Sequence, residues 1–198
     1  MNNPYDGFED HVLNDGRHFF VGQLPEEQRP DADEFEALWT LCPEKYDERM
    51  IHGRRIPLPR WQQAYGVDYH FSGQTSVALP IPPVLEPFRD WSSRAIDPRL
   101  NGLLLNWYDG ALGHYLGPHH DSTVNMVEGA PIVTISLGEE RVFRLMHPER
   151  KLTSNFTARD GTVFVMPYET NSAWKHAVPK STRYRGRRIS ITLRGLYS

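Results

Sequence analysis

The feature that most constrains the fold is a series of short, apolar, strand-like runs in the last hundred residues. Turn-forming residues separate each run from the next, and the dipeptides Asp109-Gly110 and Asp160-Gly161 are typical of β-hairpins. Many short strands at this spacing favour an antiparallel sandwich or jelly roll. The runs lie at residues 103–107, 132–137, 142–146, 152–156, 162–166, 173–178 and 189–193.

Two amphipathic helices are predicted before this β region. From Asp31 onward, apolar residues recur at helical spacing until Pro43 ends the segment. A second helix begins at Pro82-Pro83, since proline is tolerated in the first turn of a helix. The fold class that we expect is therefore mainly β with flanking helices (α+β) around a jelly-roll core.

The length of 198 residues fits a single domain that spans residues 1–198. Residues 1–30 are polar and acidic, and we expect a loosely ordered lead-in with one strand at 18–21. Residues 31–100 hold the helices, a Pro/Arg-rich loop at 53–59 and one strand-like segment at 61–71. Residues 101–198 form the expected β core.

The charge is unevenly distributed along the chain. The net charge is only -3, but the first 140 residues carry 22 acidic and 10 basic side chains, and the remaining 58 carry 3 acidic and 12 basic ones. A second basic stretch without acidic residues runs from Arg49 to Arg60. Such stretches are either solvated faces or a surface for an anionic partner.

Cysteine content and hydropathy exclude several classes of protein. A single cysteine, Cys42, excludes an internal disulfide framework and any multi-cysteine metal site. No apolar run approaches the length of a membrane span, and residues 1–30 lack the basic-then-apolar order of a secretion signal. We expect a monomer without membrane association that is cytoplasmic, or nuclear if the source is eukaryotic.

Two histidines and an aspartate have the composition of a metal site. His119-His120-Asp121 opens the β region, and His176 lies further along the chain. Two imidazoles and one carboxylate form the facial triad of non-haem Fe(II) oxygenases, which leaves coordination positions open for a co-substrate and dioxygen. Because side chains at i and i+2 of a strand point the same way, His119 and Asp121 can bind one metal while His120 points away.

The last strand-like segment carries charge on one face. In residues 187–194, Arg188, Ser190, Thr192 and Arg194 alternate with apolar residues. Two arginines in an apolar strand need carboxylate or phosphate partners if the face is buried. An exposed edge strand with arginines on its wet face is the alternative.

These residues and several linked motifs resemble the AlkB-type Fe(II)/2-oxoglutarate dioxygenases over about residues 50–198. The resemblance implies a double-stranded β-helix, which is a fold of the jelly-roll type. The motifs are Asn106-x-Tyr108, His119-x-Asp121, residues 131–138 followed by Phe143, the segment from Gly161 to Met166, Trp174-x-His176 and Arg188-x5-Arg194.

The resemblance also implies the cofactors and their ligands. Fe(II) would bind to His119, Asp121 and His176, and 2-oxoglutarate and O2 would be consumed as co-substrates. The residues implied for 2-oxoglutarate are Arg188 at its distal carboxylate, Arg194 and Asn106 at the other carboxylate, Tyr108 through a further hydrogen bond, and Ser190 where the family often has Asn.

A second resemblance points to the substrate. Residues 59–73 are similar to the nucleotide-recognition segment of the family's nucleic-acid repair branch, with its Pro-Arg, Tyr-Gly and Tyr-x-Phe-Ser-Gly elements. It implies that Phe71 stacks on a base opposite His119 and that Tyr69 binds the base edge. The residues expected to contact phosphate or fill the vacated base stack are Arg60 and, in the preceding loop, Ile51, His52 and Arg54.

The implied activity is oxidative demethylation of alkylated bases in DNA or RNA, which is a form of repair of DNA damage. The products would be formaldehyde, succinate and CO2. One alternative is a hydroxylase or demethylase of a protein or a small molecule on the same core. A second is a binding module without activity, which would require that the triad does not hold iron.

Overall fold

The computed structural model describes residues 3–51, 53–71 and 73–197, and two antiparallel sheets dominate it. The larger sheet has seven strands. In spatial order these are β1 (Glu9–Val12), β2 (His18–Gln23), β13 (Thr162–Met166), β10 (Ile132–Gly138), β15 (Arg187–Arg194), β8 (Gly102–Asp109) and β5 (Trp61–Tyr65). The smaller sheet has β12 (Leu152–Ala158), β11 (Arg141–His147), β14 (Lys175–Val178) and β9 (Leu116–His119). The described strands thus form the mainly β, jelly-roll type of fold that the sequence predicts.

The remaining elements are two hairpins and a few short helices. The hairpins pair β3 (Glu48–Ile51) with β4 (Arg54–Pro57) and β6 (Tyr69–Phe71) with β7 (Gln74–Ser76). The α-helices are α1 (Ala32–Thr40), α2 (Glu86–Ala95) and α3 (Tyr168–Ala173), with 3-10 turns η1 (Glu26–Gln28) and η2 (Pro83–Leu85). Of the helices in the described residues, none has the length and apolar character that a membrane crossing needs.

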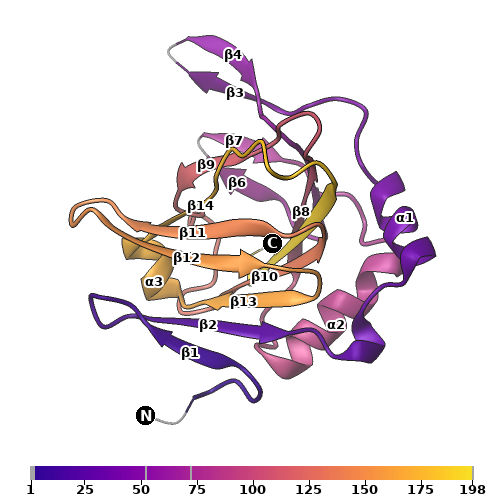
Figure 1. Cartoon of the computed structure of the whole chain (residues 1–198). Coiled ribbons are helices and arrows are strands. Elements are labelled where there is room, and N and C mark those ends of the chain that lie inside the picture. Colours follow the sequence, from indigo (N-terminus) through magenta and orange to yellow (C-terminus); the bar gives the residue numbers. More distant parts are fainter. Residues whose placement is uncertain (1–2, 52, 72, 198) are drawn as a thin grey trace.

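The helices cover one face of the large sheet, and their positions follow from local sequence. Asp31 caps α1 with a capping box in which its side chain accepts from the Glu34 amide and the Glu34 carboxylate accepts from the Asp31 amide. Leu38 of α1 and Phe88 of α2 are buried in one cluster with outward-facing residues of the sheet. Figure 1 shows α1 and α2 beside each other at one edge of the molecule.

The side chains of β15 alternate between this apolar layer and the space between the sheets. Ile189, Ile191 and Leu193 are fully buried in the cluster under the helices. The intervening residues of β15 face the opposite side and line a cavity. A second apolar cluster, which includes Phe143 of β11 and Phe164 of β13, fills the remaining space between the two sheets.

The N-terminal segment differs from the expected loose lead-in. Its predicted strand is confirmed as β2, but β1 pairs with it and β2 pairs with β13, so residues 9–23 form the edge of the large sheet. Strands from all three predicted segments of the chain therefore share one sheet. The sequence did not predict β1 because this edge strand buries none of its residues and is therefore polar in composition.

Three local expectations are wrong. Asp109-Gly110 and Asp160-Gly161 do not close hairpins, because β8 and β13 belong to the large sheet and β9 and β12 to the small one. The predicted loop at residues 53–59 contains β4, which Figure 1 shows projecting from the body with β3. The single strand expected at 61–71 is two strands, since Gly66 adopts a positive φ of 85° between β5 and β6.

We expect Gly138→Ala to lower the free energy of unfolding by about 2–5 kcal/mol. Gly138, the last residue of β10, has a φ of +82°, and an added Cβ would lie 2.5 Å from the Arg187 carbonyl oxygen. The left-handed backbone costs about 1–2 kcal/mol and the overlap about 1–3 kcal/mol more. Gly129→Ala is the control, because Gly129 has a φ of +71° and open space around it. If urea denaturation showed equal losses of unfolding free energy for the two variants, steric overlap with Arg187 would not contribute to the effect at Gly138.

Candidate metal centre

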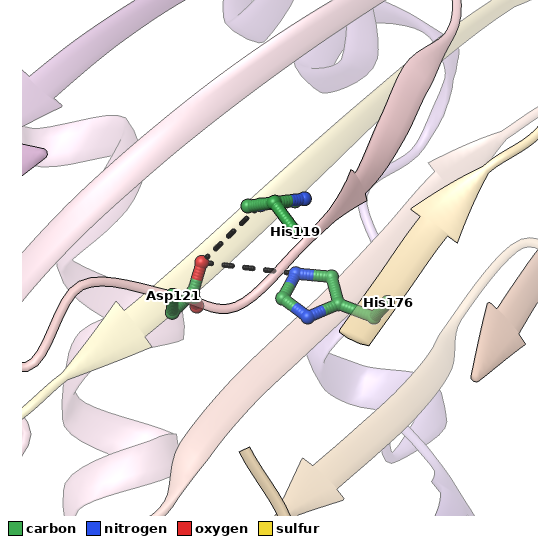
Figure 2. Close-up of side chains that lie close together, drawn as sticks. All are labelled: His119, Asp121 and His176. Carbon is green, nitrogen blue, oxygen red and sulfur yellow. Dashed lines mark ion pairs between the residues drawn. The ribbon is translucent and has the colours of Figure 1, made fainter. Parts of the chain in front are cut away.

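Two histidines and an aspartate converge at the mouth of the space between the sheets. His119 ends β9, Asp121 follows it, and His176 lies on the paired strand β14 directly opposite His119. One ligand atom from each residue lies within 4.8 Å of the other two. Figure 2 shows both imidazoles facing the same carboxylate oxygen, with Nε2 to Oδ1 distances of 3.5 Å for His119 and 3.7 Å for His176. The three residues therefore meet at one point, as the family resemblance implies.

The electrostatics of the group suit a divalent cation. Burial alone would raise the pKa of Asp121, but the adjacent Arg194 guanidinium, with smaller contributions from the two histidines, outweighs burial and holds that pKa well below its usual value. Burial lowers the pKa of His176 to about 3, so its imidazole is neutral at physiological pH. A carboxylate beside neutral imidazole is a donor set that Fe(II) accepts.

A hydrogen bond orients the ring of His119, whereas the ring of His176 is held without one in the part of the chain that the structure describes. The Gly117 carbonyl can only accept, so Nδ1 of His119, at 3.0 Å, donates to it and leaves the lone pair of Nε2 available for a metal. Nδ1 of His176 is buried without a hydrogen-bond partner among the described residues, while its Nε2 faces Asp121. His120 turns away from the group and its Nδ1 lies 2.6 Å from the Asn171 carbonyl oxygen.

The three residues open onto a cavity of about 620 Å³. Its floor is the polar face of β15, together with inward-facing residues of β8 and β10. Aromatic residues of β6 line another side. The residues of the floor are Asn106, Tyr108, Thr134, Arg188, Ser190, Thr192 and Arg194.

Arg188 is a buried cation without a carboxylate partner in the described part of the chain. Its side chain is 0% exposed, and Nε donates to Ser136 Oγ at 2.9 Å. Its two terminal nitrogens have no hydrogen-bond partner among the described residues. The guanidinium lies 5.0 Å from the ring centroid of Tyr108, and burial lowers its pKa. A buried guanidinium with two unused donors in a cavity wall fits a carboxylate ligand.

Arg194 has a different partner from the one expected. Its Nε and Nη2 donate to Oδ2 of Asp121 at 3.0 and 2.6 Å, and its guanidinium lies 4.3 Å from the ring centroid of Tyr69. Oδ1 of Asp121 is thereby left facing the histidines. Asn106, the other residue expected at the same carboxylate of the co-substrate, accepts a hydrogen bond from Arg60 at 2.7 Å.

The residues expected to bind substrate fall into two groups. Tyr69 and Phe71 both line the cavity with His119, and their rings stack at 5.6 Å with an interplanar angle of 18°. The Tyr69 hydroxyl accepts a hydrogen bond from the amide of Ser122, which follows the candidate ligand Asp121. These two residues therefore lie beside the candidate metal ligands, as a substrate wall requires.

The basic residues of the same prediction are elsewhere. Arg60, expected to contact phosphate or to fill the vacated base stack, is buried in the cavity wall and donates hydrogen bonds to Asn106 and Gln62. Arg54 is exposed on β4 and does not line the cavity. The side chain of Ile51 and the whole of His52 lie outside the described residues.

Sequence reasoning missed Asn171, which lies on α3 and is 1% exposed. Its side-chain oxygen accepts from the Asp121 amide at 2.9 Å, and its side-chain nitrogen donates to the Asp121 carbonyl at 3.1 Å. No spacing signal connects Asn171 to residue 121, because the contact spans 50 positions of the chain.

Comparison with known proteins identifies a matching family model. Residues 20–194 match the model of the 2OG-Fe(II) oxygenase superfamily. The solved structure of OsALKBH1 resembles this fold with a TM-score of 0.58 at 15% sequence identity, covering 89% of this chain and 96% of that one.

Similar proteins named DNA oxidative demethylase ALKBH2 include one from Bos taurus and one from Homo sapiens. The one from Bos taurus is 32% identical over 155 residues, which is 73% of this chain and 55% of the relative. The one from Homo sapiens is 30% identical over 155 residues, covering 73% of this chain and 59% of the relative. The matched region thus spans between half and two thirds of each of these relatives.

We expect opposite stability effects from two matched substitutions on β15. Arg188→Met should raise the free energy of unfolding of the ligand-free protein by about 1–4 kcal/mol, because it removes a buried charge that lacks a carboxylate partner. Arg194→Met should lower it by about 3–5 kcal/mol, because Asp121 loses its cation. Urea denaturation in the presence of a chelator measures both values. If both substitutions lowered the free energy of unfolding, the protein itself would already stabilise the buried charge of Arg188 without a ligand.

Proposed function

Because this chain belongs to the AlkB-type branch of the 2OG-Fe(II) oxygenase superfamily, we propose that it oxidatively demethylates alkylated bases in nucleic acid. The observation that carries the proposal is a single cavity that holds three groups of residues. These are the His119, Asp121 and His176 cluster, the unpartnered donors of Arg188, and the stacked rings of Tyr69 and Phe71.

The family uses Fe(II), 2-oxoglutarate and O2. His119, Asp121 and His176 would hold the iron, which fits their donor types and their mutual distances. Together with its co-substrates, the iron supplies the oxidant that hydroxylates an unreactive methyl group. On an N-methyl base, the product breaks down to formaldehyde and the restored base, and 2-oxoglutarate becomes succinate and CO2.

The co-substrate would bind along the polar face of β15. Arg188 would take the distal carboxylate, since each charge-assisted hydrogen bond contributes about 1.5–3 kcal/mol and satisfies a buried donor. Tyr108, which lies beside the Arg188 guanidinium, and Ser190, which lies opposite Asn106 in the sheet, would complete this end of the cavity. Arg194 and Asn106 would bind the second carboxylate of the co-substrate. Their hydrogen bonds to Asp121 and from Arg60 hold them in place for this.

The residues around the cavity would position and isolate the reacting groups. Arg194 keeps Asp121 ionised and holds one carboxylate oxygen, so only the other oxygen faces the histidines. The buried walls limit access of water to the oxidant. The aromatic pair of Tyr69 and Phe71 would hold the substrate base flat beside His119.

Base stacking would offset the cost of taking the substrate base out of its helix. Extruding a base costs a few kcal/mol, and aromatic stacking returns about 1–3 kcal/mol per base. The basic residues after position 140 would contact phosphate, which dominates affinity for nucleic acid. Alkylated DNA is the first substrate to test, because the relatives are named DNA oxidative demethylases.

The proposal predicts formaldehyde release from methylated nucleic acid but not from methylated peptides. The protein is loaded with Fe(II) and 2-oxoglutarate without oxygen, then exposed to air with panels of methylated single- and double-stranded DNA, RNA and peptides. Unmethylated oligonucleotides of the same sequence serve as controls. If the protein released formaldehyde from methylated peptides alone, the nucleic-acid hypothesis would be rejected in favour of a protein demethylase.

We expect Phe71→Ala to raise the KM for a methylated oligonucleotide about 10–100-fold, because a stacking contact worth about 1–3 kcal/mol is lost. The KM for 2-oxoglutarate should stay unchanged, since Phe71 is not among the residues of the cavity floor. Phe156→Ala is the matched control, because Phe156 is half-buried on β12 and does not line the cavity. Equal effects of the two substitutions on the oligonucleotide KM would refute a stacking role for Phe71.

A further inference from the structure

The side chain of Asn171 makes hydrogen bonds to both the backbone amide and the backbone carbonyl of Asp121. Its Oδ1 accepts from the Asp121 amide and its Nδ2 donates to the Asp121 carbonyl, so a single buried side chain fixes both polar groups of one residue. The direction of the Asp121 carboxylate follows from the backbone that carries it. The hydrogen bonds of the Asn171 side chain therefore act on a metal through Asp121.

A third hydrogen bond joins the same two segments. Because a carbonyl oxygen only accepts, Nδ1 of His120 donates to the Asn171 backbone carbonyl at 2.6 Å. His120, which does not face the candidate metal site, thus ties the segment after β9 to α3. Helix α3 ends at Ala173 and the chain continues into β14, where His176 lies. The helix therefore connects the Asp121 segment to the strand that carries the second histidine.

The N-terminal turn between β1 and β2 holds the other side of α3. Arg17 Nε donates to the Glu169 carbonyl at 3.2 Å, and Thr170 Oγ1 donates to the His18 carbonyl at 2.8 Å. Just beyond the helix, Trp174 Nε1 donates to Oδ2 of the buried Asp15 at 3.0 Å. All three contacts come from residues 15–18, which lie outside the 20–194 match to the family model.

We propose that Asn171 is a positioning residue that sets the conformation of Asp121 for metal binding, and that residues 15–18 support it through α3. Partners of metal ligands fix the ligands' orientation, and their loss typically weakens metal affinity about 10–100-fold. The inference rests on the proposed role of Asp121 as a ligand. It does not depend on which substrate the protein oxidises.

The test compares two asparagines that make the same pair of hydrogen bonds. Asn101 donates to the Leu196 carbonyl and accepts from the Leu196 amide, both at 2.8 Å, but Leu196 is not a candidate ligand. The Kd for Mn(II) is measured in the absence of 2-oxoglutarate and nucleic acid. We expect Asn171→Ala to weaken Mn(II) binding about 10–100-fold and Asn101→Ala to change it less than about threefold.

Two further measurements separate positioning from general destabilisation. The absorption spectrum of the Co(II)-loaded protein should change in Asn171→Ala but not in Asn101→Ala, because it reports the geometry of the ligands. Thermal melting of the metal-free variants gives the stability loss of each. Positioning is supported if Asn171→Ala changes the Co(II) spectrum while losing no more stability than Asn101→Ala.

The role of the N-terminal turn is tested by a second matched pair. Thr170→Val removes the hydrogen bond to His18 with little change in volume, and we expect it to weaken Mn(II) binding about threefold or more. Thr162→Val is the control, because Thr162 is equally buried and hydrogen-bonded but lies on β13. Equal Mn(II) affinities of these two variants would overturn the contribution of the turn.

The remaining outcomes are also distinct. If Asn171→Ala binds Mn(II) as tightly as the unsubstituted protein, or if both asparagine variants weaken it equally, Asn171 is not a positioning residue. If Asp121→Ala retains the original Mn(II) affinity, the ligand assignment of the proposed function fails instead. Because nucleic acid is absent from these titrations, none of the results bears on the substrate.

Discussion

The two-sided character of β15 is the constraint on which the rest of the structure depends. One face supplies Ile189, Ile191 and Leu193 to the apolar cluster under the helices, and the other supplies Arg188 and Arg194 to the cavity. A strand with side chains of both kinds is stable only between an apolar layer and a polar space. Its central place in the large sheet, paired with β10 and β8, provides both.

The two arginines of that strand have different electrostatic roles. Arg194 is neutralised within the protein by Asp121, and this pair directs one carboxylate oxygen toward the histidines. Arg188 donates to a hydroxyl and lies near an aromatic ring, but its two terminal nitrogens have no hydrogen-bond partner in the described residues, so a carboxylate ligand would satisfy them. A buried charge without an anion lowers stability, and a protein tolerates it where ligand binding recovers the energy.

The sequence predicted the parts of the site that follow from local spacing. Strand geometry predicted the same-side placement of His119 and Asp121, the outward turn of His120 and the alternation along β15, and the structure agrees with each placement even though β9 ends at His119. Arg60 was expected at phosphate or in the vacated base stack because its segment resembles a nucleotide-recognition segment, whereas in the structure it donates hydrogen bonds to Asn106 and Gln62 inside the cavity wall. Turn dipeptides were misread as hairpins, because a turn signal does not specify the sheet to which the next strand belongs.

What the sequence determined by itself is therefore the local pattern: short strands, two amphipathic helices, and the residue types able to bind iron and a dicarboxylate. Only the tertiary structure decided that His176 lies opposite His119, that Asn171 binds Asp121 and that the N-terminal turn supports α3. Each of these contacts joins residues that are at least 50 positions apart in the sequence. Periodicity extends only over neighbouring residues, and the pairing of distant segments depends on how the whole chain buries its apolar faces.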